Sequence, residues 1–210
     1  MTTLSVPGVP FTLTPSAGPR WTVDEAGALS VTSEARTDIF IDPAMVDAEP
    51  GAAAGAGVVL NASTLLGTPP AGDFQLSARV TVDFQSTFDA GVLLVWVDDR
   101  RWSKLCFELT PAGEPMIVSV VNRGVSDDAN GAIIDGQSVW LRVARIGGTI
   151  ALHHSTDGAV WHLVRVFALD GLVDARVGFE GQSPTGEGCT VRFDDVRFTT
   201  ERLENQRDGS

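Results

Sequence analysis

A two-residue alternation divides residues 102–109 of this chain into two sets of side chains. Successive side chains of a strand point to opposite faces of a sheet, so each set shares one face. One set is Leu105, Phe107 and Leu109, and the other is Trp102, Lys104, Cys106 and Glu108. The first set predicts a core face, and the second predicts a polar surface that presents an aromatic ring, a cation and a carboxylate.

The rest of the chain repeats this pattern of short β segments separated by turns, with no amphipathic helix of ten or more residues. Turn signals include Asp98-Asp99, Pro111-Ala112-Gly113, Gly147-Gly148 and Asp157-Gly158. The fold class is therefore all-β. The expected strands are Thr22–Val23, Leu29–Val31, Phe40–Ile41, Val58–Leu60, Phe74–Phe84, Ala90–Val97, Ser103–Leu109, Met116–Asn122, Ser138–Arg145, Thr149–His154, Trp161–Phe167, Asp174–Glu180 and Thr190–Thr199.

Two hairpins have a predicted register. A two-residue turn at Gly147-Gly148 pairs Arg142 with His153 and Leu141 with His154. We expect His154 to be a hydrogen-bonded core histidine and His153 to lie with Arg142 on the outer face. In the other hairpin, we expect Leu109 to face Met116, which places Trp102 opposite Arg123; a one-residue slip reverses this second arrangement.

Length and composition predict one domain over residues 1–200, followed by a frayed polar tail over 201–210. Of the 210 residues, 43% are hydrophobic and 20% charged, which is a globular profile. The small-residue stretch over 49–57 predicts a surface loop. No apolar run is long enough to span a bilayer, and the first residues lack the plan of a secretion signal, so we expect a cytoplasmic protein without membrane contact.

The formal net charge of −12 opposes contact with phosphate backbones, so nucleic acid is not an expected partner. The two cysteines, Cys106 and Cys189, lack metal-ligand spacing and are expected to be reduced and structural. Residues 127–131 carry oxygen ligands but no glutamate at the spacing of a calcium loop, so we expect a solvated turn there. We expect no metal and no cofactor.

Several segments together resemble one family. They are Arg36–Pro43, Asp73–Phe74, Asp89–Leu94, Asp98–Lys104, Val139–Arg145, Ser155–Trp161, Gln182–Pro184 and Val191–Asp195. The chain is identified as a member of the YesU-like, regulation-of-enolase-like family, a domain of unknown function. The resemblance implies a concanavalin A-like jelly roll of two antiparallel sheets, one of them concave. It also implies links to sugar metabolism or to control of enolase, and leaves the chemistry open.

The candidate ligand site comprises Trp102, Lys104, Glu108, Arg142, Glu180 and His153. In this site an exposed Trp102 ring stacks on a sugar, and the charged groups bond hydroxyl or carboxylate groups. The other tryptophans, Trp21, Trp96, Trp140 and Trp161, are interpreted as packing residues. An equally strong alternative is that the charges are solvated sheet positions, with Arg142 paired to Glu108 or Glu180.

Three hypotheses about function follow. The first is binding of a carbohydrate or sugar acid on the concave sheet. The second is an enzyme with Glu108 as acid or base and Glu180 as the second carboxylate, although the Glu-x-Asp-x-x-Glu pattern of catalytic glucanases with this fold is absent. The third is a protein-interaction or regulatory module, which includes association between copies of this chain.

Overall fold

The computed structural model describes residues 3–45 and 57–210, and within them the chain is almost entirely β. The first sheet has seven antiparallel strands, in the spatial order β1 (Thr14–Pro15), β6 (Ser63–Gly67), β15 (Arg176–Gln182), β8 (Ala90–Asp98), β9 (Arg101–Leu109), β10 (Pro115–Arg123) and β11 (Ser126–Ile133). The second has the order β14 (His162–Ala168), β13 (Thr149–Ser155), β12 (Ser138–Ile146), β7 (Phe74–Asp83), β16 (Thr190–Thr199), β3 (Leu29–Thr32) and β2 (Thr22–Val23).

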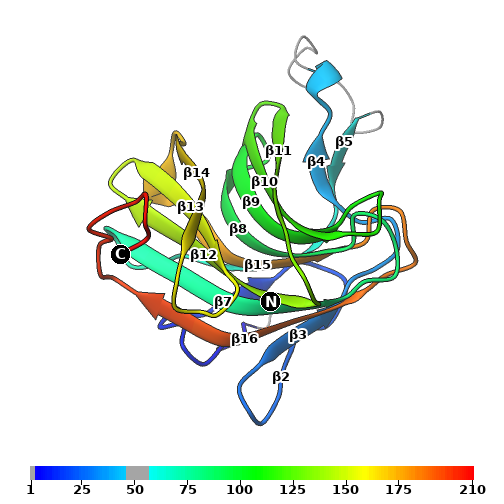
Figure 1. The fold of residues 1–210 in the computed structure, drawn as a ribbon, viewed down its shortest axis with the longest axis horizontal. Coiled ribbons are helices and arrows are strands. Elements are labelled where there is room, and N and C mark those ends of the chain that lie inside the picture. The colour runs from blue at the N-terminus through cyan, green and yellow to red at the C-terminus, as the bar shows by residue number, and fades with distance from the viewer. Residues whose placement is uncertain (1–2, 46–56) are drawn as a thin grey trace.

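The two sheets pack face to face, and the first sheet is curved, so the predicted two-sheet jelly roll is confirmed (Figure 1). The inward side chains of both sheets form one large core, in which Phe107 of β9 and Phe193 of β16 are fully buried. Alternation of buried and half-buried residues along β7 shows the two-residue period directly. Short 3-10 turns at Pro43–Met45 (η1) and Leu172–Asp174 (η2) are the helical elements of the described residues.

A separate pair of strands, β4 (Ile39–Ile41) and β5 (Val58–Leu60), stands over the concave outer face of the first sheet (Figure 1). We call this pair the β4–β5 arm. Ile39 and Ile41 are 2% and 0% exposed, and they pack on apolar side chains of that face such as Leu94. The arm therefore builds a second hydrophobic cluster outside the core between the sheets.

The two predicted hairpin registers had different outcomes. In β12–β13, Arg142 faces His153 and Leu141 faces His154, as predicted. In β9–β10, Leu109 faces Pro115, so Asn122 rather than Arg123 lies opposite Trp102, and that register prediction was wrong by one residue. The longer β9–β10 turn is compatible with more than one strand register, whereas the two-glycine turn fixes a single register.

Other predictions fail where the sequence signal is weak. Residues 127–131, expected as a solvated turn, lie inside β11, and β1 and β6 were not anticipated.

Cys106 and Cys189 are free and buried, as expected. The predicted loop over 49–57 lies outside the described residues apart from Gly57.

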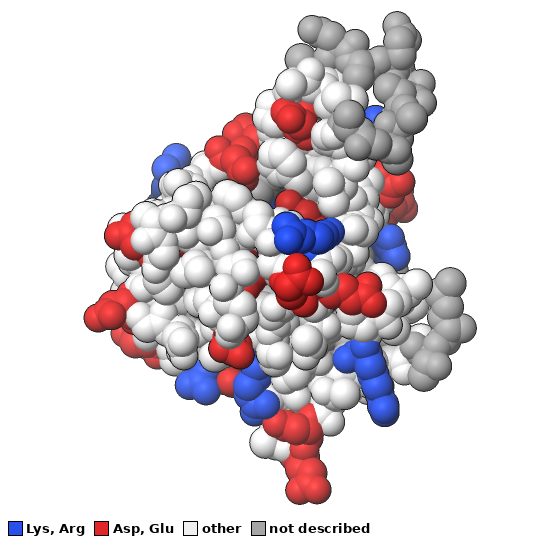
Figure 2. Space-filling view, turned by 90° about the vertical axis from the view of Figure 1, so that its right-hand side faces the viewer, with Lys and Arg blue, Asp and Glu red and all other residues white. Residues whose placement is uncertain are grey.

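The described residues contain no helix long and apolar enough to cross a membrane. Figure 2 shows the right-hand face of Figure 1, where acidic and basic side chains are interspersed and do not form a broad basic patch.

Candidate functional site

Strand β9 has the predicted side-chain parity, but not the predicted environment. Leu105 and Phe107 lie in the core between the sheets, whereas Trp102 and Cys106 lie in the cluster under the β4–β5 arm. Lys104 shares this concave face, since its ammonium nitrogen lies 5.9 Å from the centroid of the Trp102 ring. The two predicted faces are therefore correct, although the arm covers the one expected to meet solvent.

Trp102 is consequently not the exposed sugar platform that the sequence suggested. Its side chain is 0% exposed, and its ring lies parallel to that of Trp96 on β8, with 6.4 Å between ring centroids. The arm excludes both solvent and ligand from Trp102. A residue that only the tertiary fold covers cannot be recognised as buried from strand alternation alone.

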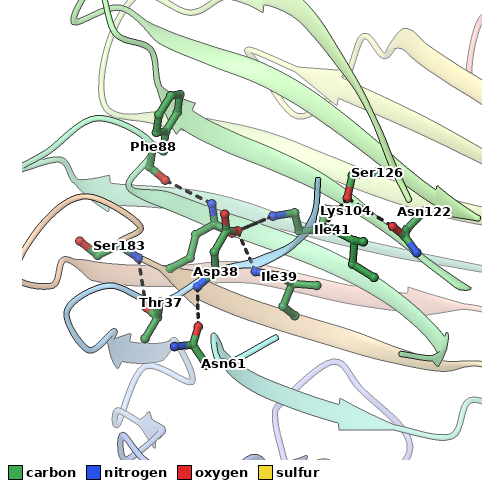
Figure 3. Close-up of polar contacts among 11 residues, drawn as sticks. Thr37, Asp38, Ile39, Ile41, Asn61, Phe88, Lys104, Asn122, Ser126 and Ser183 are labelled. Atoms are coloured by element: carbon green, nitrogen blue, oxygen red, sulfur yellow. Dashed lines mark hydrogen bonds and ion pairs between the residues drawn. The ribbon is translucent and has the colours of Figure 1, made fainter. Parts of the chain in front are cut away.

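Lys104 is the centre of a buried polar network (Figure 3). Its ammonium group donates hydrogen bonds of 2.9 Å to Asp38 Oδ1 and of 2.9 Å to Gln182 Oε1. Gln182 in turn donates through Nε2 to the carbonyl oxygen of Phe88 at 3.2 Å. Burial lowers the pKa of Lys104, but the nearby carboxylates of Asp38 and Glu180 raise it, and the net direction is upward. Lys104 therefore stays charged although it is only 2% exposed.

The backbone around Asp38 is fixed by its neighbours, which explains how the carboxylate reaches Lys104. Asn61 Oδ1 accepts a hydrogen bond from the Asp38 amide at 2.9 Å, and the amides of Asn61 and Ala62 donate to the Asp38 carbonyl. At the end of β4, the amide of Ile41 donates to Ser126 Oγ at 2.9 Å (Figure 3). The Ile41 bond holds the arm against β11, and the bonds of Asn61 and Ala62 hold Asp38 in place beside the arm.

Beside this network is a cleft of about 420 Å³ on the concave face. We call it the Glu108 cleft. Its lining combines apolar and polar side chains, namely Asp38, Phe40, Phe88, Lys104, Glu108, Val118, Val120, Asp128, Asn130, Gln182, Pro184 and Thr185. Its volume and mixed lining are in the range of small-molecule binding sites in proteins.

The carboxylates of this region have raised pKa values. Burial raises the pKa of Glu108 to about 8, with Lys104 opposing the rise and Asp38 adding to it. Burial likewise raises the pKa of Glu180 to about 8, against the effect of Lys104. Within the described residues, neither carboxylate oxygen of Glu180 has a hydrogen-bond partner. Burial also raises the pKa of Asp128 at the cleft edge.

Phe88 stands at the edge of the cleft in an unfavourable backbone conformation. Its φ is 70°, in the left-handed region, which costs a non-glycine residue roughly 1–2 kcal/mol. Its amide donates to the Leu109 carbonyl at 2.7 Å, while its carbonyl accepts from Gln182. The side chain is 37% exposed and lines the Glu108 cleft. The hydrogen bonds to Leu109 and Gln182 thus hold the Phe88 backbone in its strained conformation, and this conformation places the aromatic ring at the cleft.

Two predicted site residues, Arg142 and His153, lie elsewhere. They belong to β12 and β13 of the second sheet, where residues of the C-terminal segment 201–210 cover them. Arg142 donates to the Gly209 carbonyl at 2.7 Å and lies over the Trp161 ring, and His153 Nε2 contacts the Gln206 carbonyl at 2.8 Å. Arg142 therefore pairs with neither Glu108 nor Glu180, and neither Arg142 nor His153 belongs to the Glu108 cleft.

Three further expectations are overturned, and the same segment accounts for two of them. Leu203 is 4% exposed and packs on the second sheet, so residues 201–210 are docked rather than frayed. His153, expected on an open face, is 0% exposed, and burial lowers its pKa to about 4. His154, expected as a hydrogen-bonded core residue, is half-buried beside the His162 ring, and its Nδ1 has no partner among the described residues.

Of the residues that line the cleft, the sequence interpretation placed only Lys104 and Glu108 in the site. The residues it missed include Asp38, Phe88, Asp128, Asn130 and Gln182. Asp128 and Asn130 are two residues apart and share one face of β11, a spacing that was readable once the segment was assigned as a strand. Asp38 and Gln182 occurred only as parts of the family resemblance. Within residues 3–45 and 57–210, no group of three or more His, Cys, Asp or Glu side chains is arranged to hold a metal ion.

Among solved structures, the chain resembles a functionally unknown protein from Saccharomyces cerevisiae. The TM-score is 0.74 at 24% identity, covering 90% of this chain and 97% of that one. It also resembles BlXynB, a GH43 protein from Bacillus licheniformis, with a TM-score of 0.69 at 12% identity. The latter match covers 91% of this chain but 37% of that one, so this fold corresponds to about a third of the larger protein. At these identities the likenesses show the fold alone.

The sequence is 26% identical over 183 residues to a Saccharomyces cerevisiae protein named "Regulation of enolase protein 1", covering 86% of each chain. Residues 16–201, most of the described sandwich, match one family model. The chain therefore belongs to the family described as protein of unknown function (DUF1349).

Proposed function

We propose that this protein binds a neutral carbohydrate in the Glu108 cleft. The observation that carries the proposal is the combination, in one space of about 420 Å³, of an aromatic ring at the edge and hydrogen-bonding side chains along the walls. A sugar ring has apolar C–H faces and a rim of hydroxyl groups, so it complements such a lining. Phe88 offers the ring, and Glu108, Asn130 and Asp128 offer the polar groups.

The charge of the cleft favours a neutral sugar over a sugar acid at this position. Asp38, Glu108 and Asp128 line it, while its one lining cation among the described residues, Lys104, already bonds Asp38. A ligand carboxylate would approach the carboxyl groups of Asp38 and Asp128 and find no free cation to compensate its charge. A protonated Glu108, by contrast, can donate one hydrogen bond to a hydroxyl and accept another.

The name of one structurally similar protein supports the proposal of a carbohydrate ligand. A structure with the same fold is part of a "xylan beta-1,4-xylosidase" from Bacillus halodurans, with a TM-score of 0.64 at 14% identity and 33% of that chain covered. Folds carry many functions, so this likeness adds support only where the cleft itself offers suitable chemistry.

A second candidate, an enzyme that uses Glu108 as general acid, is favoured by one observation. The pKa of about 8 keeps Glu108 protonated at neutral pH while its side chain lines an open cleft. Glycoside hydrolysis uses an acid of this kind together with a second carboxylate. Asp38 and Asp128 are the other carboxylates that line the cleft.

Titration calorimetry with neutral xylose-, glucose- and galactose-based trisaccharides tests the binding proposal. Phe88→Ala is expected to weaken binding by about 1–3 kcal/mol, since the stacked apolar area is lost. The matched control is Val173→Ala, which removes another exposed apolar side chain (77% exposed) outside the cleft and leaves binding unchanged. Equal affinity of wild type and Phe88→Ala refutes the assignment.

The enzyme candidate has a separate readout. Product analysis with the same sugars should show turnover that Glu108→Gln abolishes while binding persists. Binding without product in the wild type rejects catalysis on these substrates and leaves the binding proposal intact.

A further inference from the structure

The concave face has a second cleft, which the β4–β5 arm separates from the first. Successive side chains of β4 point to opposite faces, so Asp38 and Phe40 line the Glu108 cleft while Ile39 lines the second cleft. This second space has a volume of about 310 Å³ and also borders β1, β6, β8 and β15. We call it the Trp96 cleft.

Trp96 and Arg176 form the distinctive part of its lining. They are directly opposed residues of β8 and β15, so their side chains leave the same face of the sheet as neighbours. Trp96 is partly exposed, and its parallel contact with the buried Trp102 ring fixes its orientation. Arg176 is exposed and forms no ion pair within the described residues. The cleft thus presents an aromatic ring beside a free guanidinium.

The charge of the Trp96 cleft is opposite to that of the Glu108 cleft. No Asp or Glu of the described residues lines it, although the chain has 27 acidic and 15 basic residues. Its other polar groups are hydroxyls, from Thr14, Ser16 and Thr64. Ser16 Oγ accepts a hydrogen bond from the Thr64 amide at 3.0 Å, so its own proton remains available to a ligand.

We propose that the Trp96 cleft binds a uronic acid, a sugar ring that carries a carboxylate. The Trp96 ring packs against the C–H face of the sugar, and the Arg176 guanidinium pairs with the carboxylate through two parallel hydrogen bonds. The hydroxyls of Ser16 and Thr64 bond the hydroxyl groups of the ring. The lining of the Glu108 cleft disfavours this carboxylate, so the two clefts discriminate by charge and the second site goes beyond the proposed function.

Solution NMR of ¹⁵N-labelled protein tests the proposal, with sodium glucuronate as the probe and glucose as its uncharged counterpart. The reporter is the indole N–H signal of Trp96, assigned by its disappearance in Trp96→Phe. We expect glucuronate to shift this signal with saturation, and glucose to leave it in place. No shift at about 10 mM glucuronate, a concentration that detects even weak sites, overturns the proposal.

Arg176→Gln removes the charge of the side chain and leaves a shorter, neutral amide in its place. We expect this variant to bind glucuronate about tenfold or more weakly, because a charge-assisted pair is lost. The matched control is Arg207→Gln, another exposed arginine, which lies outside the cleft and should leave affinity unchanged. Equal affinity of Arg176→Gln and wild type, or equal loss in Arg207→Gln, overturns the assignment.

Glu108→Gln separates this proposal from the carbohydrate-binding function. We expect the variant to retain the glucuronate-induced shift of Trp96, since Glu108 lines only the other cleft. Loss of the shift in Glu108→Gln places glucuronate in the Glu108 cleft and overturns the second site.

Discussion

The buried carboxyl group of Glu180 makes the stability of this protein depend on pH. Its side chain is 0% exposed, and neither oxygen has a hydrogen-bond partner among the described residues. Burial raises its pKa from the ordinary 4.5 to about 8, in spite of the opposing charge of Lys104. Glu180→Gln removes the ionisation and keeps the size of the side chain, so it isolates this effect.

The sign follows from the protons bound in each state. Between about pH 4.5 and pH 8 the folded protein holds a proton on Glu180, which the unfolded chain has released. The contribution of Glu180 to the free energy of unfolding therefore falls by about 1.4 kcal/mol per pH unit in this window, and levels off above it. Relative to the wild type, Glu180→Gln should gain up to ~4 kcal/mol at about pH 8, and less than ~1 kcal/mol at about pH 5.

Urea unfolding of wild type and Glu180→Gln at about pH 5 and about pH 8 measures the difference. Glu187→Gln is the matched control, because the side chain of Glu187 is 86% exposed and should show no such gain. Parallel pH profiles for wild type and Glu180→Gln, or lower stability of Glu180→Gln at the higher pH, would refute the reasoning.

Three other changes test the backbone and the buried network. Phe88→Gly and Phe88→Ala both remove the ring, but Gly adopts φ 70° without strain, so urea unfolding should show Phe88→Gly to be the more stable by about 1 kcal/mol; the reverse order contradicts the strain argument. Lys104→Met leaves Asp38 without its cation and should lower the free energy of unfolding by about 3–5 kcal/mol; a loss under about 1 kcal/mol contradicts the network. Gly209 has a φ of 76°, and Gly209→Ala would add a methyl group that collides with Arg142. Hydrogen exchange of the backbone amides in the C-terminal segment should therefore accelerate by about tenfold or more. Unchanged exchange would show that this contact does not hold the segment.

Local features of the sequence predicted the fold class and the orientation of individual strands. Alternation in β9 correctly placed Leu105 and Phe107 in the core and Lys104 on the opposite face, since strand parity depends only on neighbouring residues. The Gly147-Gly148 turn likewise fixed the β12–β13 register, because the turn and both strands are contiguous in the chain.

The composition of the site was only partly predictable. Lys104, Glu108 and Glu180 were identified correctly as residues of one concave face, but Arg142 was assigned to the wrong sheet. Strand alternation shows that a side chain points away from the core, but it does not show on which of the two sheets of the sandwich that side chain lies. The side chains on each face are decided by which strands pair, and this pairing joins β15 to β8, whose paired residues are more than a third of the chain apart.

By itself, the sequence determined an all-β sandwich, the parity of its strands and a set of polar residues that point outward. The tertiary structure alone decided which of those outward faces meet solvent. The β4–β5 arm covers Trp102, and the C-terminal segment covers Arg142 and His153. Lys104 bonds partners that lie 66 and 78 residues away, and contacts of such separation follow from chain topology rather than from local pattern.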